Sequence, residues 1–136
     1  MTGKNCELDM KEADGVLEVS LGGEIDHHSA VIVRTQIDER ISELRPQRTV
    51  IDLSGIEFMD SSGLGLIMGR YALMQKIGGG LSVKNPNERI VKIFELAGLD
   101  KIISIEGIKK ADKPVSRPTT KKRKKQRREK NETKGN

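Results

Sequence analysis

Short apolar segments alternate with longer amphipathic ones along most of this chain, and this alternation restricts the fold more than any other feature. Two apolar segments come first, at residues 8–11 and 16–21, and the tight-turn pair Asp14-Gly15 between them predicts a β-hairpin. Further strands are expected at 49–53, 81–84 and 102–105, and helices at about 29–44, 61–77 and 88–96. The order β-β-α-β-α-β-α-β predicts a single α/β domain with a mixed, largely parallel sheet and right-handed crossovers.

The C-terminal residues differ in composition from the rest of the chain. Residues 113–136 hold 11 Lys or Arg and 2 Glu, a net charge of +9, whereas residues 1–112 hold 14 Lys or Arg and 18 Asp or Glu, a net charge of −4. Residues 121–128 contain no apolar side chain, so they cannot bury enough surface to offset the entropy lost on ordering. We therefore expect a folded domain at residues 1–110 and a disordered basic tail at 111–136, although a last helix beginning near Gly107 and running into the tail is also compatible with the sequence.

Composition restricts the class of protein further. Aromatic residues make up only 2% of the 136 residues and Trp is absent, so the core must be aliphatic. No segment approaches the roughly 20 consecutive apolar residues that span a bilayer, and the N-terminus has no apolar run typical of a secretory signal. Cys6 is the only cysteine, which permits no internal disulfide and fits a reducing compartment. We expect a cytoplasmic protein without membrane partners.

The segment after the strand at 49–53 contains the most informative residues. After a turn expected at Ser54-Gly55, Asp60 is suited to cap a helix, because its carboxylate can accept from the unpaired N–H groups of the first turn. Ser61 would then lie at the start of that helix, close to open N–H groups and the positive end of the dipole. Such a position tolerates an added negative charge, although a Ser-Ser pair after Asp is by itself most often a simple cap.

The same helix carries two different stripes of residues. Leu64, Ile67, Met68 and Tyr71 form an apolar stripe, whereas Ser61, Gly65 and Gly69 form a line with almost no side chains. A glycine inside a helix costs about 1 kcal/mol relative to alanine, so two on one line require an explanation. One explanation is close packing of the helix on its own sheet. We prefer an outer track that a partner's backbone approaches, because the apolar stripe already supplies a core face.

Other kinds of chemistry receive little support. His27 and His28 are adjacent at the expected start of a helix and point roughly 100° apart, whereas a zinc site usually needs four ligands. The nucleophile-elbow pattern Gly-x-Ser-x-Gly is absent around Ser61 and Ser62, and the triplet at 78–80 precedes a strand, the reverse of a phosphate-binding loop. We therefore expect no catalytic residue, no metal and no cofactor.

Two motifs resemble a known family. The segment Asp60-Ser61-Ser62-Gly63-Leu64-Gly65-Leu66-Ile67 through Arg70-Tyr71 resembles the phosphoserine helix of bacterial anti-sigma factor antagonists, the STAS-domain proteins. Gly23-Glu24-Ile25-Asp26-His27-His28 resembles their second signature, especially that of the sporulation-type members. The similarity covers roughly residues 5–107 and leaves out the basic tail.

The resemblance implies both a fold and a function. It implies the α/β STAS architecture, and it matches Ser61 to the serine that a partner anti-sigma factor kinase phosphorylates. It also implies that Asp26, which by sequence could equally cap a helix, contacts that kinase. Glu24 shares the expected loop at 24–29, and Ser62, Gly65 and Gly69 complete the expected partner surface.

In the implied cycle, the unphosphorylated protein binds the kinase and so frees a sigma factor. Phosphorylation of Ser61 ends this binding, and a separate phosphatase reverses the modification.

Two alternatives stay open. The first is a general-stress-type or other STAS signalling module, with the same fold and serine but a different kinase. The second is a nucleic-acid-binding protein acting through the tail, because runs of Lys and Arg attract polyanions. The tail contains no aromatic residue for base stacking, so any such binding should be weak in sequence preference. The interpretation that assigns the tail no binding role is that it is a solvated appendage.

Overall fold

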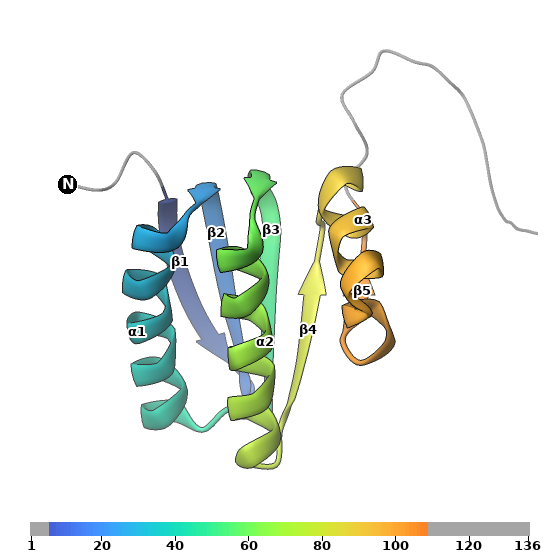
Figure 1. The fold of residues 1–136 in the computed structure, drawn as a ribbon. Coiled ribbons are helices and arrows are strands. Elements are labelled where there is room, and N and C mark those ends of the chain that lie inside the picture. Colours follow the sequence, from blue (N-terminus) through green and yellow to red (C-terminus); the bar gives the residue numbers. More distant parts are fainter. Residues whose placement is uncertain (1–5, 109–136) are drawn as a thin grey trace, which may run out of the picture.

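The computed structural model describes residues 6–108 (Figure 1). The expected basic tail, and any helix continuing beyond Ile108, lie outside the described residues. The elements follow the predicted order and are β1 (Cys6–Ala13), β2 (Val16–Ile25), α1 (His27–Leu44), β3 (Arg48–Met59), α2 (Ser61–Lys76), β4 (Gly80–Lys84), α3 (Glu88–Ala97), a 3-10 turn η1 (Leu99–Lys101) and β5 (Ser104–Glu106).

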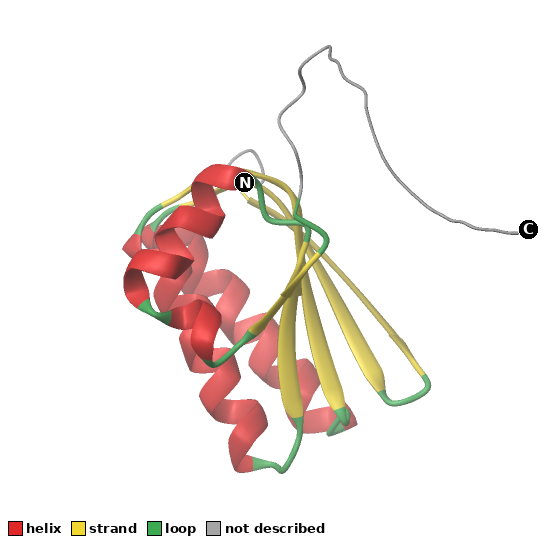
Figure 2. Ribbon diagram, turned by 90° about the vertical axis from the view of Figure 1, so that its right-hand side faces the viewer, coloured by secondary structure: helices red, strands yellow, loops and turns green. Residues whose placement is uncertain are grey.

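The five strands form one mixed sheet in the order β1-β2-β3-β4-β5. β1 and β2 are antiparallel, and every other neighbouring pair is parallel, as the sequence predicted. Because strand order follows chain order, successive right-handed crossovers place all three α-helices on the same face of the sheet (Figure 2). The other face of the sheet carries no helix among the described residues (Figure 2).

The opening hairpin forms where the sequence predicted it. Asp14 and Gly15 both adopt positive φ angles, 54° and 80°, which suits the tight turn of a two-residue hairpin. Ala13 pairs with Val16 directly across this turn.

Two strands run further than predicted. The pair Gly22-Gly23 does not end β2, and Ser54-Gly55 is not a turn but part of β3. Gly22 lies opposite Gly55, at a place where the register of the two strands shifts by one residue. A Cβ on Gly55 would lie 3.0 Å from the Leu21 carbonyl oxygen, so the glycines permit close backbone approach without breaking the strand pairing.

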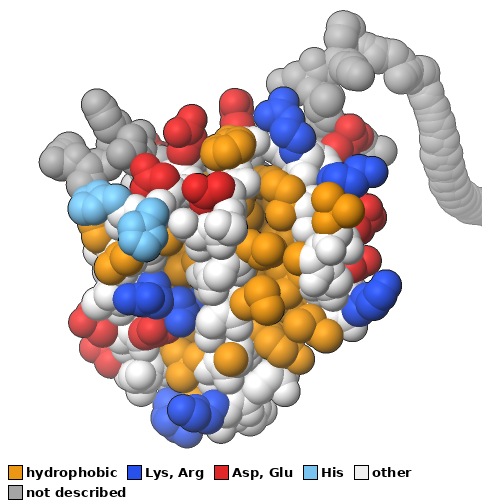
Figure 3. Space-filling model, viewed as in Figure 1, with side chains coloured by type: hydrophobic (Ala, Val, Ile, Leu, Met, Phe, Trp, Pro, Cys, Tyr) orange, Lys and Arg blue, Asp and Glu red, His pale blue; other side chains and the backbone are white. Residues whose placement is uncertain are grey.

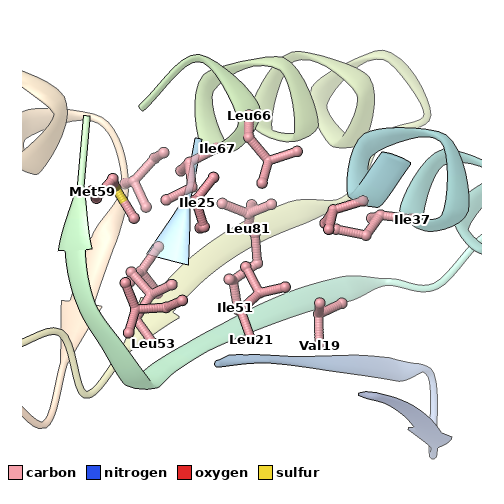
Figure 4. Packing of buried hydrophobic residues seen from close by; sticks show 14 of the residues in the cluster. Val19, Leu21, Ile25, Ile37, Ile51, Leu53, Met59, Leu66, Ile67 and Leu81 are labelled. Carbon is pink, nitrogen blue, oxygen red and sulfur yellow. The ribbon is translucent and has the colours of Figure 1, made fainter. Parts of the chain in front are cut away.

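The core is mainly aliphatic, as composition predicted, but the aromatic side chain of Phe94 is fully buried in it, and the core lies between the sheet and the helices. Every other residue of β2 is buried on the helix side from Leu17 to Leu21. Figure 4 shows side chains from five elements packed together there; those labelled are Val19, Leu21, Ile25, Ile37, Ile51, Leu53, Met59, Leu66, Ile67 and Leu81. On α1 the apolar side chains that face this core are Val33, Ile37 and Ile41, spaced four residues apart, while Leu44 in the last turn is exposed.

The predicted core stripe of α2 is partly wrong. Ile67 is buried, but Met68 is 45% exposed, and Leu64 and Tyr71 are only partly buried. The buried residues are instead Gly63, Leu66, Ile67, Arg70 and Met74. α2 packs against α1 on one side and against the sheet behind it (Figure 1), so these two neighbours decide which residues of α2 are buried. The buried residues are therefore displaced around the helix from its most apolar stripe.

Candidate functional site

The two sequence motifs meet at one edge of the sheet. β2 and β3 are parallel, and Ile25 pairs with Met59 at their carboxyl ends. Asp26 directly follows β2 and precedes α1, and Asp60 directly follows β3 and precedes α2. Because neighbouring strands of any sheet lie about 5 Å apart, the two helices begin close together. Figure 1 shows both helices beginning at this edge and running side by side.

Asp60 caps α2 as predicted. Its Oδ1 accepts from the Ser62 backbone N–H at 2.8 Å, and its carbonyl oxygen accepts from the Gly63 N–H at 3.1 Å. Ser61 is the first residue of the helix and is exposed, whereas Ser62 is partly buried. The Ser61 hydroxyl therefore lies on the surface at a helix N-terminus, where the dipole favours negative charge.

Asp26, and not Ser29, is the N-cap of α1. Its Oδ1 accepts from the Ser29 N–H at 2.9 Å and from the Ser29 hydroxyl at 3.0 Å, while the Asp26 N–H donates to Ser29 Oγ at 3.0 Å. These reciprocal bonds form a capping box. The Ser29 backbone and side-chain hydrogen bonds, with a smaller effect of His28, hold the pKa of Asp26 below its usual value. The carboxylate is thus kept charged and fixed in orientation.

The line of small residues on α2 faces outward. Gly65 is exposed, and a Cβ built on Gly65 or Gly69 would meet no atom within 4 Å. Close packing of these two glycines on the sheet is therefore excluded. Gly63 is the glycine that packs, since a Cβ there would lie 2.4 Å from Met59 Cγ. The Ser61–Gly65–Gly69 track therefore lies on the outer side of α2, as the preferred interpretation requires, while its approach by a partner stays a prediction.

A groove between α1 and α2 runs beside this track. It encloses about 270 Å³ and is lined by His27, Ala30, Val31, Arg34, Ser62, Gly65 and Leu66. Sequence reasoning missed the contribution of Val31 and Arg34. Their spacing from His27 and Ala30, which places all four on one face of α1, was the available signal.

An ion pair joins the two helices, with Arg70 buried and Asp38 partly exposed. Arg70 Nε lies 2.8 Å from Asp38 Oδ1, but the N–H is not aligned for a hydrogen bond, and Arg70 Nη1 has no hydrogen-bond partner among the described residues. Burial lowers the pKa of Arg70; nearby Asp38 opposes this shift, and Arg34 adds to it. Arginine stays protonated in proteins, so the pair is an ion pair that fixes α1 against α2.

Carboxylates surround the exposed serine. Glu57 and Asp60 are exposed, Asp26 is partly buried, and Glu24 is exposed near the end of β2, not in a loop as expected. Figure 3 shows acidic side chains gathered at the edge where α1 and α2 begin. The structure thus brings Glu24, Asp26, Ser61 and Ser62 to one edge, while Gly65 and Gly69 extend the surface down α2.

Within residues 6–108, no group of three or more His, Cys, Asp or Glu side chains is arranged to hold a metal ion. No helix in this part of the chain is long and apolar enough to cross a membrane.

Comparison with known proteins identifies the family. The STAS domain model matches residues 7–111. The chain belongs to the STAS domain family. The resemblance drawn from the two motifs is thereby confirmed.

Relatives within the family carry related names. The anti-sigma F factor antagonist of Paenibacillus polymyxa is 42% identical over 101 residues, covering 74% of this chain and 86% of the relative. The anti-sigma-B factor antagonist of Bacillus subtilis strain 168 is 35% identical over 104 residues, covering 74% and 91%. The solved structure of the unphosphorylated anti-sigma factor antagonist SpoIIAA has a TM-score of 0.66 and 26% identity, covering 73% of this chain and 87% of that one. The solved structure of the Bacillus cell fate determinant SpoIIAA in its phosphorylated form has a TM-score of 0.61 and 26% identity, covering 73% of this chain and 90% of that one.

Proposed function

We propose that this STAS domain is an anti-sigma factor antagonist, a regulatory binding protein and not an enzyme. Its unphosphorylated form binds an anti-sigma factor kinase through the start of α2 and so releases a sigma factor. Phosphorylation of Ser61 by the kinase ends the binding, and a phosphatase restores it. The observation that carries the proposal is the pairing of Ile25 with Met59, which puts the Asp26 and Ser61 motifs on neighbouring strand ends.

The surface around Ser61 suits a close approach by another backbone. The track of Ser61, Gly65 and Gly69 presents no large side chain, and nothing in the described part of the chain covers it. Asp26 supplies a charge that is fixed by Ser29. Glu24 and Ser62 lie beside it and complete the proposed partner surface.

Phosphate on Ser61 should leave the fold intact and act on binding. The added charge of about −1.5 to −2 meets a favourable helix dipole, while Asp60, Glu57 and Asp26 repel it. These opposing effects are of similar size, so we expect little change in stability. At an interface that covers the track, however, a dianion must be desolvated without a cationic partner, which costs several kcal/mol, and each 1.4 kcal/mol is tenfold in affinity.

The test uses two variants and two candidate kinases, the anti-sigma F and anti-sigma B factors. Ser61→Ala should bind and resist phosphorylation, and Ser61→Asp should stay folded but bind at least tenfold more weakly. Thr35→Ala, on α1 and outside the proposed partner surface, is the control and should bind and accept phosphate at Ser61. Affinities by calorimetry, with mass-spectrometric mapping of the phosphate, decide the matter. Phosphate on another residue, or equal affinities of the two Ser61 variants, would contradict the switch.

A second candidate keeps the fold and the serine but changes the pathway. Its support is the anti-sigma-B factor antagonist, which is 35% identical to this chain, compared with 42% for the anti-sigma F factor antagonist. Preferential binding and phosphorylation by the anti-sigma B factor would establish this general-stress-type function in place of the sporulation type.

A further inference from the structure

The sheet face opposite the helices is uncovered in the described part of the chain (Figure 2). The strand register places the residues that alternate with the core on this face. They include five carboxylates and three cationic side chains, namely Glu7, Asp9, Glu18, Asp52 and Glu106, with Lys11, Arg48 and Lys84. The face is polar, and its net charge is negative.

Charge on this face is unevenly distributed. Lys84 Nζ lies 2.7 Å from Glu18 Oε2, and Arg48 Nη2 lies 3.5 Å from Glu106 Oε2, so two of the three cations already have anionic partners. Of the remaining carboxylates, Glu7 and Asp9 lie on β1 with Lys11, and Asp52 lies on β3, where it accepts from the Ser54 N–H at 2.9 Å and from Asn85 Nδ2 at 3.4 Å. The three carboxylates outnumber Lys11, so this end of the face is acidic.

A hollow lies at this acidic end. Its floor is the register shift where Gly22 faces Gly55, because neither residue has a side chain to fill the space. The hollow encloses about 400 Å³, and its lining includes Glu7, Asp9 and Asp52. It is large enough to take the stem of a long cationic side chain while the charged end reaches a carboxylate.

We propose that this open face is the docking surface for the chain's own polybasic segment, residues 121–128. That segment contains seven Lys or Arg and no acidic residue, so its charge is opposite to that of the face. The contact is electrostatic and requires no regular structure in the segment. It does not depend on the phosphorylation switch.

Chain length places the segment within reach. β5 lies at one edge of the sheet, and 12 residues, 109–120, separate Ile108 from Lys121. From β5 to the hollow over β2 is about three strand spacings, or roughly 15 Å. At 12 residues, a chain with random-coil dimensions has a root-mean-square span of about 17–21 Å, so the span matches the gap and the effective concentration is in the millimolar range.

Docking would hold the basic segment away from polyanions. A nucleic acid or another polyanion then binds only the undocked fraction, which lowers its apparent affinity in proportion. Docking and polyanion binding therefore compete for the same basic residues, and the docking contact weakens as salt rises.

Zero-length carbodiimide cross-linking of the full chain tests the docking directly. At low salt, monomeric product should carry links from lysines of residues 121–125 to Glu7, Asp9 or Asp52, and these links should fade at high salt. Glu7→Gln/Asp9→Asn should reduce the links to Asp52 as well, whereas Glu39→Gln on the helix side is the matched control and should not. Tail links spread over all surface carboxylates, or found only in dimers, would overturn the proposal.

Polyanion binding supplies a second readout. With oligo(dT) as the probe, the Glu7→Gln/Asp9→Asn variant should bind about threefold or more tightly than the unmodified chain, because its tail is free. The Glu39→Gln control should bind as the unmodified chain does. Equal affinity of all three proteins, or weaker binding by the double variant, would contradict masking.

Discussion

At the scale of single residues, the glycines of α2 differ in what surrounds them. Gly63 packs on Met59, whereas Gly65 and Gly69 face open space. Gly63→Ala should therefore destabilise the domain by about 1–3 kcal/mol, because a Cβ would overlap Met59 Cγ. Gly65→Ala should stabilise it by about 0.5–1 kcal/mol through its higher helix propensity. Urea unfolding of both variants measures these changes, and a destabilised Gly65→Ala would contradict the open track.

The Asp26 cap gives a prediction about acid stability. Hydrogen bonds from Ser29 hold the pKa of Asp26 below its usual value, so the folded state favours the carboxylate. This stabilisation is present above the pKa of an unfolded Asp, about 3.9, and is lost as pH falls through the lower folded value. Ser29→Ala should raise the pKa of Asp26 toward its usual value, as followed by carboxyl NMR titration. Thr35→Ala, which removes a hydroxyl that donates only to the Val31 carbonyl oxygen, should leave it unchanged.

The same residue tests whether the α1 cap also contacts a partner. Asp26→Ala should lower the melting temperature through loss of the cap. If Asp26 also meets the kinase, affinity should fall by more than the unfolded fraction explains. Normal affinity of the folded variant in calorimetry would leave Asp26 a structural role alone.

At the scale of elements, the ion pair between α1 and α2 is the contact most sensitive to removal of one partner. The side chains of Arg70 and Asp38 are 7% and 38% exposed. Asp38→Ala should cost about 1–3 kcal/mol, because it leaves a buried guanidinium without its anion. Arg70→Met in the same chain should recover part of that loss, since the charge itself is gone.

A double-variant cycle of Asp38→Ala and Arg70→Met by chemical unfolding gives the coupling between the two residues. The exposed pair Arg40–Glu43, 4.0 Å apart, is the control, and Glu43→Ala should change stability by less than about 0.5 kcal/mol. Additive effects of Asp38→Ala and Arg70→Met would show that the ion pair contributes no specific coupling.

Local sequence was sufficient for the kind and order of the elements, since periodicity and caps are local properties. The cap at Asp60 and the hairpin turn at Asp14-Gly15 both lie where their chemistry predicted. Strand ends were less predictable, because Gly22 and Gly55 could either end a strand or form a bulge, and the partner strand decides. The rotation of α2 depends on its contact with α1, which no local pattern encodes. For the same reason Arg34 and Arg70 were missed.

At the scale of the whole molecule, the basic tail should add little to the stability of the domain. An electrostatic contact without apolar burial contributes little against conformational entropy, so deleting residues 113–136 should change the free energy of unfolding by about 0.5 kcal/mol or less. Thermal and urea unfolding at physiological salt measure this. A loss of several kcal/mol would mean that the tail packs through apolar side chains.

The order of the strands has a consequence for how the domain is built on the ribosome. Each strand pairs with the strand that precedes it in the chain, so every new strand of a nascent polypeptide finds its neighbour already synthesised. The hairpin of β1 and β2 can form first, and each βα unit then extends one growing edge without waiting for distant residues. β5, only three residues long and paired on one side, joins last and should be the first strand to exchange its amide protons.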